Sequence, residues 1–122
     1  MVRGTDSGPL LGPSYQLPGG PRARLRVARP SDAAGIRRLL ADLGVELDLL
    51  PLLRFDPRRR IAVCASALVG SSEVILGVGA IDLDGSEPDA LIVDERQAPG
   101  LSDLLHAALL GRAAASQRAR AA

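Results

Sequence analysis

The segment best suited to bind a ligand is residues 97–102, "QAPGLS", which follows an apolar run and opens an amphipathic segment. A strand that passes directly into a helix presents unpaired backbone N–H groups, and the helix dipole favours negative charge at the same place. Gly100 permits a close backbone approach or a positive φ, and Gln97 and Ser102 offer polar side chains. The turn is a candidate cradle for a phosphate-bearing ligand, although a Gly and a Ser also suit an ordinary helix start.

The other reactive side chains give weaker signals. His106, the single histidine, lies within the amphipathic segment, and Cys64, the single cysteine, lies among strand residues, so we interpret both as structural. No Cys-rich metal site can be assembled from this set, and no metal is predicted. Four acidic residues surround one turn with a spacing that does not fit a calcium loop: Asp82, Asp84, Glu87 and Asp89.

The elements that must position the turn are predicted from hydrophobic periodicity. Residues 24–28 alternate as a short strand. The helix that follows takes Ser31 as its N-cap and Gly44 as its C-terminal stop. Residues 45–57, "VELDLLPLLRFDP", carry five leucines around Pro51 and favour a short or broken second helix.

Three more strands and a second long helix complete the predicted fold. The apolar runs 60–68 and 73–82 predict a hairpin across a turn of small residues, and 90–95, "ALIVDE", is a short fourth strand. Leucines at helical spacing from Leu101 onward predict the second helix. The fold class is therefore α/β (α+β), with a mixed, mainly antiparallel sheet that helices cover on at least one face.

The 122 residues suffice for one domain, which we place at 23–115. Residues 1–22 are rich in Gly and Pro and show no period, so they are predicted to be a disordered leader outside the fold. Residues 116–122 keep helical propensity but lose the apolar stripe, which indicates a flexible tail.

Charge and composition exclude several classes of partner. The chain has 15 basic residues, all of them Arg, against 14 acidic ones, a formal charge of +1. This balance predicts neither a nucleic acid nor an anionic membrane as partner. One cysteine allows no intrachain disulfide, and the sequence has neither a secretory signal nor a long apolar run, so a cytoplasmic location is expected.

Taken in order, these segments resemble the GNAT superfamily of N-acetyltransferases over about residues 25–115. "RVARPSDAAGIRRLLADLG" looks like the family's first strand and helix, and "IAVCASA" with "EVILGVGAIDLD" looks like its central hairpin. "ALIVDERQAPGLSDLLHAAL" resembles the acetyl-CoA signature, in which Gln or Arg is followed at +3 by Gly and at +5 by Gly or Ala. Gln97 and Gly100 match that signature, and Ser102 stands where Gly or Ala is usual.

The resemblance implies that acetyl-CoA is the co-substrate and that an amine, which the sequence does not identify, accepts the acetyl group. The strand residues would align the pantetheine and the turn amides would hold the diphosphate. Asp94 and Glu95 adjoin the expected thioester position and are candidate catalytic residues, with solvated turn carboxylates as the alternative. The implied cofactor-binding residues are Leu91, Ile92, Val93, Gln97, Ala98, Pro99, Gly100, Leu101 and Ser102. Binding of this kind requires that the protein's own oxygens leave the turn amides free.

Only the N-terminal half of the GNAT fold is represented, because the family continues beyond this helix with further strands. Three explanations stay open: a truncated or degenerate member without activity, a domain completed by a second copy or another polypeptide, or a superficial likeness. The alternative function is a non-enzymatic interaction module that pairs through an open sheet edge, either as a homodimer or with a partner.

Overall fold

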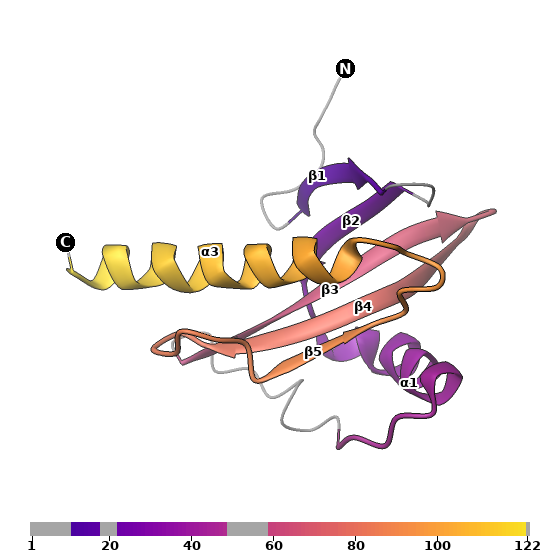
Figure 1. The fold of residues 1–122 in the computed structure, drawn as a ribbon, viewed down its shortest axis with the longest axis horizontal. Coiled ribbons are helices and arrows are strands. Elements are labelled where there is room, and N and C mark those ends of the chain that lie inside the picture. The colour runs from indigo at the N-terminus through magenta and orange to yellow at the C-terminus, as the bar shows by residue number, and fades with distance from the viewer. Residues whose placement is uncertain (1–10, 18–21, 49–58, 122) are drawn as a thin grey trace.

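A computed structural model describes residues 11–17, 22–48 and 59–121 (Figure 1). These residues form an α+β fold, in which one open antiparallel sheet carries two α-helices. Each strand pairs with its neighbours in sequence, in the order β1-β2-β3-β4-β5. The elements are β1 (Leu11–Gln16), β2 (Arg22–Val27), the 3₁₀ turn η2 (Pro30–Asp32), α1 (Ala33–Leu43), β3 (Arg60–Val69), β4 (Ser72–Asp82), β5 (Ala90–Val93) and α3 (Leu101–Ala121).

The apolar character of β3 explains why both faces of the sheet carry a helix. Val63 and Ala65 belong to the cluster that packs under α3, whereas Ala62 and Cys64 belong to the cluster under α1. Successive strand residues point to opposite faces, so a strand that is apolar at every position must be covered on both. The prediction of a helix-covered sheet is confirmed, with α1 and α3 on opposite sides (Figure 1).

The predicted β3–β4 hairpin is confirmed, and β4 contains an irregularity near its middle. Val69 pairs with Ser72 across a two-residue turn in which Gly70 has φ 65°, a conformation that favours glycine. Further along, Ala65 pairs with Gly77 but Ser66 pairs with Ile75, which leaves Leu76 as the extra residue of a β-bulge.

Two glycines of β4 let α3 lie close to the sheet. A Cβ atom added at Gly79 would come within 2.6 Å of Leu109 Cδ1, and one at Gly77 would come within 3.2 Å of Leu101 Cδ2. Both leucines are fully buried on the inner face of α3. The small β4 residues therefore determine how near the last helix, and the turn that precedes it, approaches the sheet centre.

The structure corrects the predicted disordered leader. Residues 11–16 of that segment form β1, which pairs antiparallel with β2, and Leu17 is buried against the α3 face. The earlier leader residues lie outside the described ranges. At the other end of the chain, α3 continues through the predicted tail to Ala121, and Gln117 Nε2 donates to Leu83 O at 2.9 Å.

The start of α1 is also organised differently from the prediction. Ser31 is exposed and does not cap the helix; instead Asp32 Oδ2 accepts a hydrogen bond from Arg29 N at 2.7 Å. The predicted C-terminal stop is confirmed, because Gly44 ends α1 with φ 68°. Residues 45–48 of the predicted broken helix are not helical, and 49–57 lie outside the described ranges.

Candidate functional site

Asp94 joins the end of β5 to the turn that precedes α3. Its amide donates to the carbonyl oxygen of the bulge residue Leu76 at 2.9 Å, and the residue is only 1% exposed. Its carboxylate accepts a 2.7 Å hydrogen bond from Gln97 Nε2 and further ones from the amides of Arg96 and Gln97. Asp94 thus holds the turn in shape from inside the protein.

The electrostatics of Asp94 do not fit the predicted role of a catalytic base. The hydrogen bond from the Gln97 side chain, assisted by the backbone amides and by Arg96, keeps the pKa of Asp94 below its ordinary value despite burial. A base that must collect a proton works best with a pKa near the ambient pH, and its lone pairs must be accessible. Both conditions argue against Asp94 and for a structural assignment.

Glu95 belongs to the turn before α3, and its carboxylate lies at the N-terminal end of that helix. Its two carboxylate oxygens accept hydrogen bonds from Gly100 N at 3.1 Å and Ser102 N at 3.3 Å. Negative charge is favourable at this position, because the first amides of a helix have no partner within the helix. Glu95 is exposed, so these two contacts can exchange with solvent or with another anion.

The turn amides are therefore not free, which contradicts the condition for coenzyme binding stated above. Gln97 N and Ala98 N donate to Asp94 O at 3.2 and 2.9 Å, and Leu101 N donates to Ala98 O at 3.1 Å. Gly100 N and Ser102 N are taken by Glu95, and proline 99 has no amide hydrogen. Only the Glu95 contacts involve a side chain that can move away.

Other predictions about the turn are met. Gly100 has φ 87°, as expected for a position that needs glycine, and the helix starts at the next residue. The side chains of Ala98 and Leu101 are fully buried in the α3 cluster, so these two residues can offer only main-chain atoms to a ligand.

A small cleft lies between this turn and α1. Its volume is about 230 Å³, and it is lined by the two turn residues Asp94 and Gln97 together with Arg38, Asp42 and Glu73. Ligand pockets for drug-sized molecules usually exceed roughly 300 Å³. The cleft is thus suited to a small polar group rather than to a whole nucleotide.

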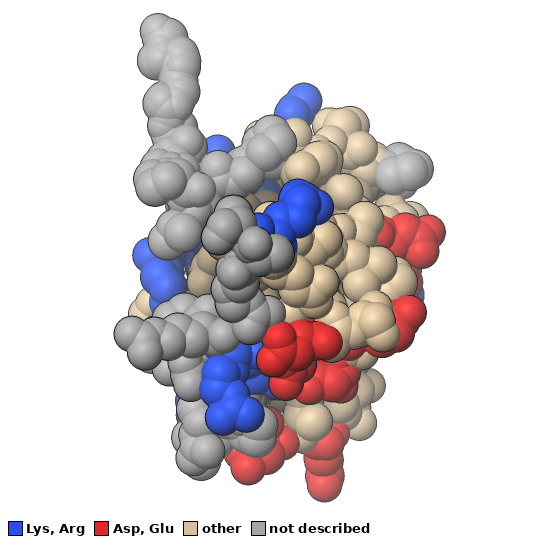
Figure 2. Space-filling view, turned by 90° about the vertical axis from the view of Figure 1, so that its left-hand side faces the viewer, with Lys and Arg blue, Asp and Glu red and all other residues tan. Residues whose placement is uncertain are grey.

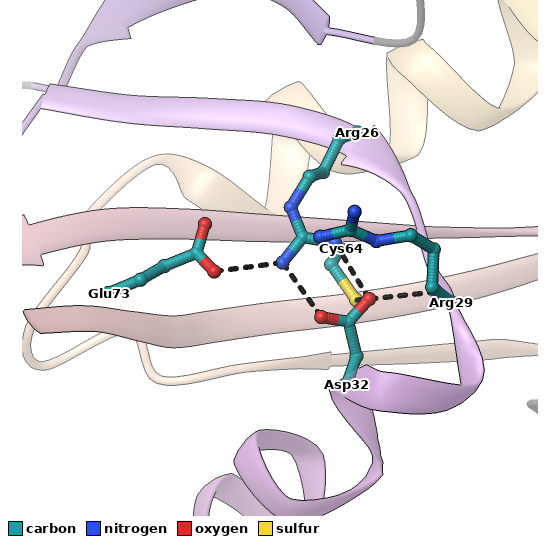
Figure 3. A network of polar contacts seen from close by, with 5 residues as sticks. All are labelled: Arg26, Arg29, Asp32, Cys64 and Glu73. Atoms are coloured by element: carbon teal, nitrogen blue, oxygen red, sulfur yellow. Dashed lines mark hydrogen bonds and ion pairs between the residues drawn. The ribbon is translucent and has the colours of Figure 1, made fainter.

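A buried ion network on the α1 face was not predicted from the sequence (Figure 3). The guanidinium of Arg26 donates to both oxygens of Asp32 at 2.7 Å and to Glu73 Oε1 at 3.0 Å. Arg26 and Asp32 are 5% and 7% exposed. The network ties β2, the start of α1 and the start of β4 together, which is a structural role.

Electrostatics within the network are consistent with full ionisation. Burial opposes the charged form of Asp32, but hydrogen bonds from Arg26 and from Arg29 N outweigh it, and the pKa of Asp32 is lowered. The hydrogen bond to Asp32 raises the pKa of Arg26 above its ordinary value, although burial opposes this. Cys64, with Sγ 4.0 Å from Asp32 Oδ2, is fully buried, and burial raises the pKa of its thiol to about 12. The thiol is therefore protonated at neutral pH and is not an active nucleophile.

The outer edge of β5 is open among the described residues, because β5 pairs only with β4. The Asp94 amide faces β4, so by antiparallel alternation the main-chain groups of Ile92 face β4 and those of Leu91 and Val93 face away. The three strand residues assigned to pantetheine alignment thus include two with outward-facing backbone groups.

The acidic turn between β4 and β5 lies on the end of the molecule shown in Figure 2. Asp89 forms a bidentate ion pair with Arg60, and Glu87 Oε2 lies 3.2 Å from His106 Nε2. Asp82 accepts a hydrogen bond from Asp84 N. These carboxylates form exposed surface contacts, and His106 is one of their partners, consistent with the structural role expected for it.

Within residues 11–17, 22–48 and 59–121, no group of His, Cys, Asp or Glu side chains is arranged to hold a metal ion. The same ranges contain no helix that is both long and apolar enough to cross a membrane.

The described residues define an α+β fold with one antiparallel sheet, whose β5 edge is open within these ranges, and with a turn before α3 whose Gly100 and Ser102 amides donate to the protein's own Glu95. Comparisons of the chain with models of known families, with curated protein sequences and with solved structures found no match.

Proposed function

We propose that the chain is a GNAT-like domain that binds acetyl-CoA at the turn before α3, with the diphosphate replacing the Glu95 carboxylate. The observation that carries the proposal is the convergence of the Gly100 and Ser102 amides on one pair of anionic oxygens. A diphosphate presents oxygens of the same kind to the same donors. The Gly100 conformation and the open edge of β5 beside the turn support the same assignment.

Displacement of Glu95 is energetically reasonable. Its hydrogen bonds lie at the surface, where a bond to a charged group contributes only about 1.5–3 kcal/mol and salt screens the charge. A diphosphate carries more charge than one carboxylate and interacts more strongly with the helix dipole. Once displaced, Glu95 would be an exposed carboxylate beside β5 and the remaining candidate catalytic residue, whereas Asp94 stays committed to the turn.

Isothermal titration with CoA tests the proposal in the wild-type chain and in the isosteric variant Glu95→Gln. Removal of the competing charge should tighten CoA binding several-fold, whereas Gly100→Val should abolish it, because a β-branched residue disfavours positive φ. Asp103→Asn is the matched control, since it removes an acid from the first turn of α3 without freeing either amide. Absence of binding in both the wild type and Glu95→Gln would refute the coenzyme assignment.

A second candidate function is strand addition at the open edge of β5, which the outward-facing groups of Leu91 and Val93 favour. Antiparallel pairing of β5 with a second copy about Ile92 would place Asp89 opposite Glu95, and like charges in that position are unfavourable. The edge therefore fits a partner segment with alternating apolar residues and basic flanks better than it fits itself.

The test is fluorescence anisotropy with two synthetic peptides, Arg-Val-Tyr-Val-Arg and Glu-Val-Tyr-Val-Glu. Only the basic-flanked peptide should bind, and Val93→Pro should prevent binding, because it removes an outward N–H without breaking a bond to β4. Binding of the two peptides with equal affinity, or unchanged binding to Val93→Pro, would contradict edge pairing. A stable homodimer in light scattering would contradict the charge argument.

A further inference from the structure

One face of β2 carries an arginine at every second position: Arg22, Arg24 and Arg26. The intervening Ala23 and Leu25 are buried on the opposite, α3 side of the sheet. Because side chains of a strand alternate between faces, the three arginines share the α1 side. They have different surroundings along that face.

Only Arg26 is neutralised by carboxylates, namely Asp32 and Glu73. Arg22 and Arg24 are exposed, and neither forms an ion pair with any described residue. The carboxylate of Glu73 is already bound by Arg26 and by a hydrogen bond with the Ser66 side chain. Two neighbouring positive charges therefore lie side by side on this face without a protein counter-ion among the described residues.

These two arginines line a cleft of about 270 Å³ on the sheet. Strand register places Ser14, Arg24 and Ser66 in one row across β1, β2 and β3. Neighbouring strands are about 4.8 Å apart, so a hydroxyl flanks Arg24 on each side. Arg22 lies two residues before Arg24 along β2, and Ala67, Leu68 and Glu73 complete the lining.

The geometry points to a binding site for a small oxyanion, the carboxylate or phosphate monoester group of a small molecule, in the cleft between Arg22 and Arg24. The Cα atoms of Arg22 and Arg24 are about 7 Å apart along the strand, so their two guanidinium groups can converge on one anion. The planar guanidinium matches both kinds of oxyanion through paired N–H donors, and the Ser14 hydroxyl adds a neutral donor, whereas the Ser66 hydroxyl is engaged with Glu73. The cleft shares no lining residue with the turn before α3, so the proposal does not depend on coenzyme binding.

The experiment is a ¹⁵N NMR titration of the full chain with inorganic phosphate and, separately, with succinate, at constant ionic strength. Saturable shifts should centre on Ser14, Arg24 and Ser66 for at least one of the two probes, and the probe that binds more tightly identifies the source of the oxyanion. Arg22→Gln and Arg24→Gln should each weaken binding about tenfold, the loss expected for one charge-assisted contact. Arg37→Gln, which removes an exposed arginine from α1, should leave the affinity unchanged.

Three results would overturn the inference. The first is that neither phosphate nor succinate gives saturable shifts, and the second is equal affinity in the wild type and Arg24→Gln. The third is a set of shifts confined to Gly100 and Ser102, which would assign anion binding to the start of α3 instead. Arg22 and Arg24 are exposed, so the variants keep the core, and their undisturbed amide spectra verify this directly.

Discussion

The two helix starts of this fold both rely on acidic side chains, but they use them in opposite ways. At α1, Asp32 is buried and is held by a bidentate bond from Arg26. At α3, exposed Glu95 accepts hydrogen bonds from two main-chain amides, and no cationic side chain among the described residues pairs with it. A buried ion pair cannot be opened without leaving an unpaired charge, whereas an exposed carboxylate can be exchanged for another anion. The α1 start is thus a structural joint, and the α3 start is the place where we propose that a ligand binds.

The largest loss of stability should come from a change to the buried ion network at the start of α1. Arg26→Gln leaves Asp32 buried without its cation, and we expect a loss of roughly 3–5 kcal/mol in the free energy of unfolding. Urea denaturation measures it, with Arg24→Gln as the control on the exposed part of the same strand face. A loss no greater than that of the control would show that the network does not stabilise the fold.

Acid should weaken the same joint to a lesser degree, because a protonated carboxyl can still accept a hydrogen bond. The pKa values of Asp32 and Glu73 lie below their ordinary 3.8 and 4.5 in the folded protein. Their contribution is therefore fully present above the ordinary values and is lost as the pH falls through the lowered folded ones. Urea midpoints between pH 7 and pH 2 should fall on the acid side, and less steeply in Arg26→Gln; parallel curves for the two proteins would contradict the linkage.

The next largest loss of stability should come from a change to Asp94, the buried carboxylate of the turn. Asp94→Ala removes the acceptor of the Gln97 side chain and of two amides, and we expect a cost of roughly 1–3 kcal/mol. Thermal unfolding can compare it with Asp42→Ala, an exposed position on α1. If the two variants unfolded at the same temperature, the turn would not depend on Asp94.

The smallest loss of stability should come from a change to Glu95, the exposed carboxylate that can be exchanged for another anion. Glu95→Gln keeps one acceptor oxygen for the Gly100 and Ser102 amides, replaces the other with an NH2 group and removes an exposed charge, so we expect a loss of about 0.3–1 kcal/mol, the value of a charge at a helix start. Chemical denaturation at low and high salt should show this small difference shrinking as salt increases. A loss as large as that of Asp94→Ala would mean that Glu95 is a structural residue and not an exchangeable one.

Much of the fold followed from local patterns. Alternation and small-residue turns predicted the β3–β4 hairpin, and helical spacing with Gly44 predicted α1. The strand before the turn and the helix after it were also predicted correctly, as was the glycine conformation at Gly100. These features depend on residues close together in the chain, where periodicity and glycine conformation act directly.

The missed features depend on residues brought together by folding. The segment of β1 contains Gly and Pro and lacks a period, so only its pairing with β2 reveals it as a strand. The spacing of Arg26 and Asp32 around the start of α1 was a usable signal for part of the buried network, but Glu73 lies 47 residues from Arg26. Alternation placed Arg24 and Arg26 on the same side of β2 but did not show that one is buried and the other exposed.

The sequence alone determined that this chain builds an antiparallel sheet with helices against it and that a strand leads through Gly100 into the last helix, because each of these depends on short-range periodicity and backbone preference. Only the tertiary structure decided which oxygens accept hydrogen bonds from the amides of that turn. The outcome depends on the burial of Asp94, whose amide donates to the bulge residue Leu76, and on the resulting position of the Glu95 carboxylate. Burial and hydrogen-bond partners are properties of the folded neighbourhood, and they separate a fixed carboxylate from an exchangeable one.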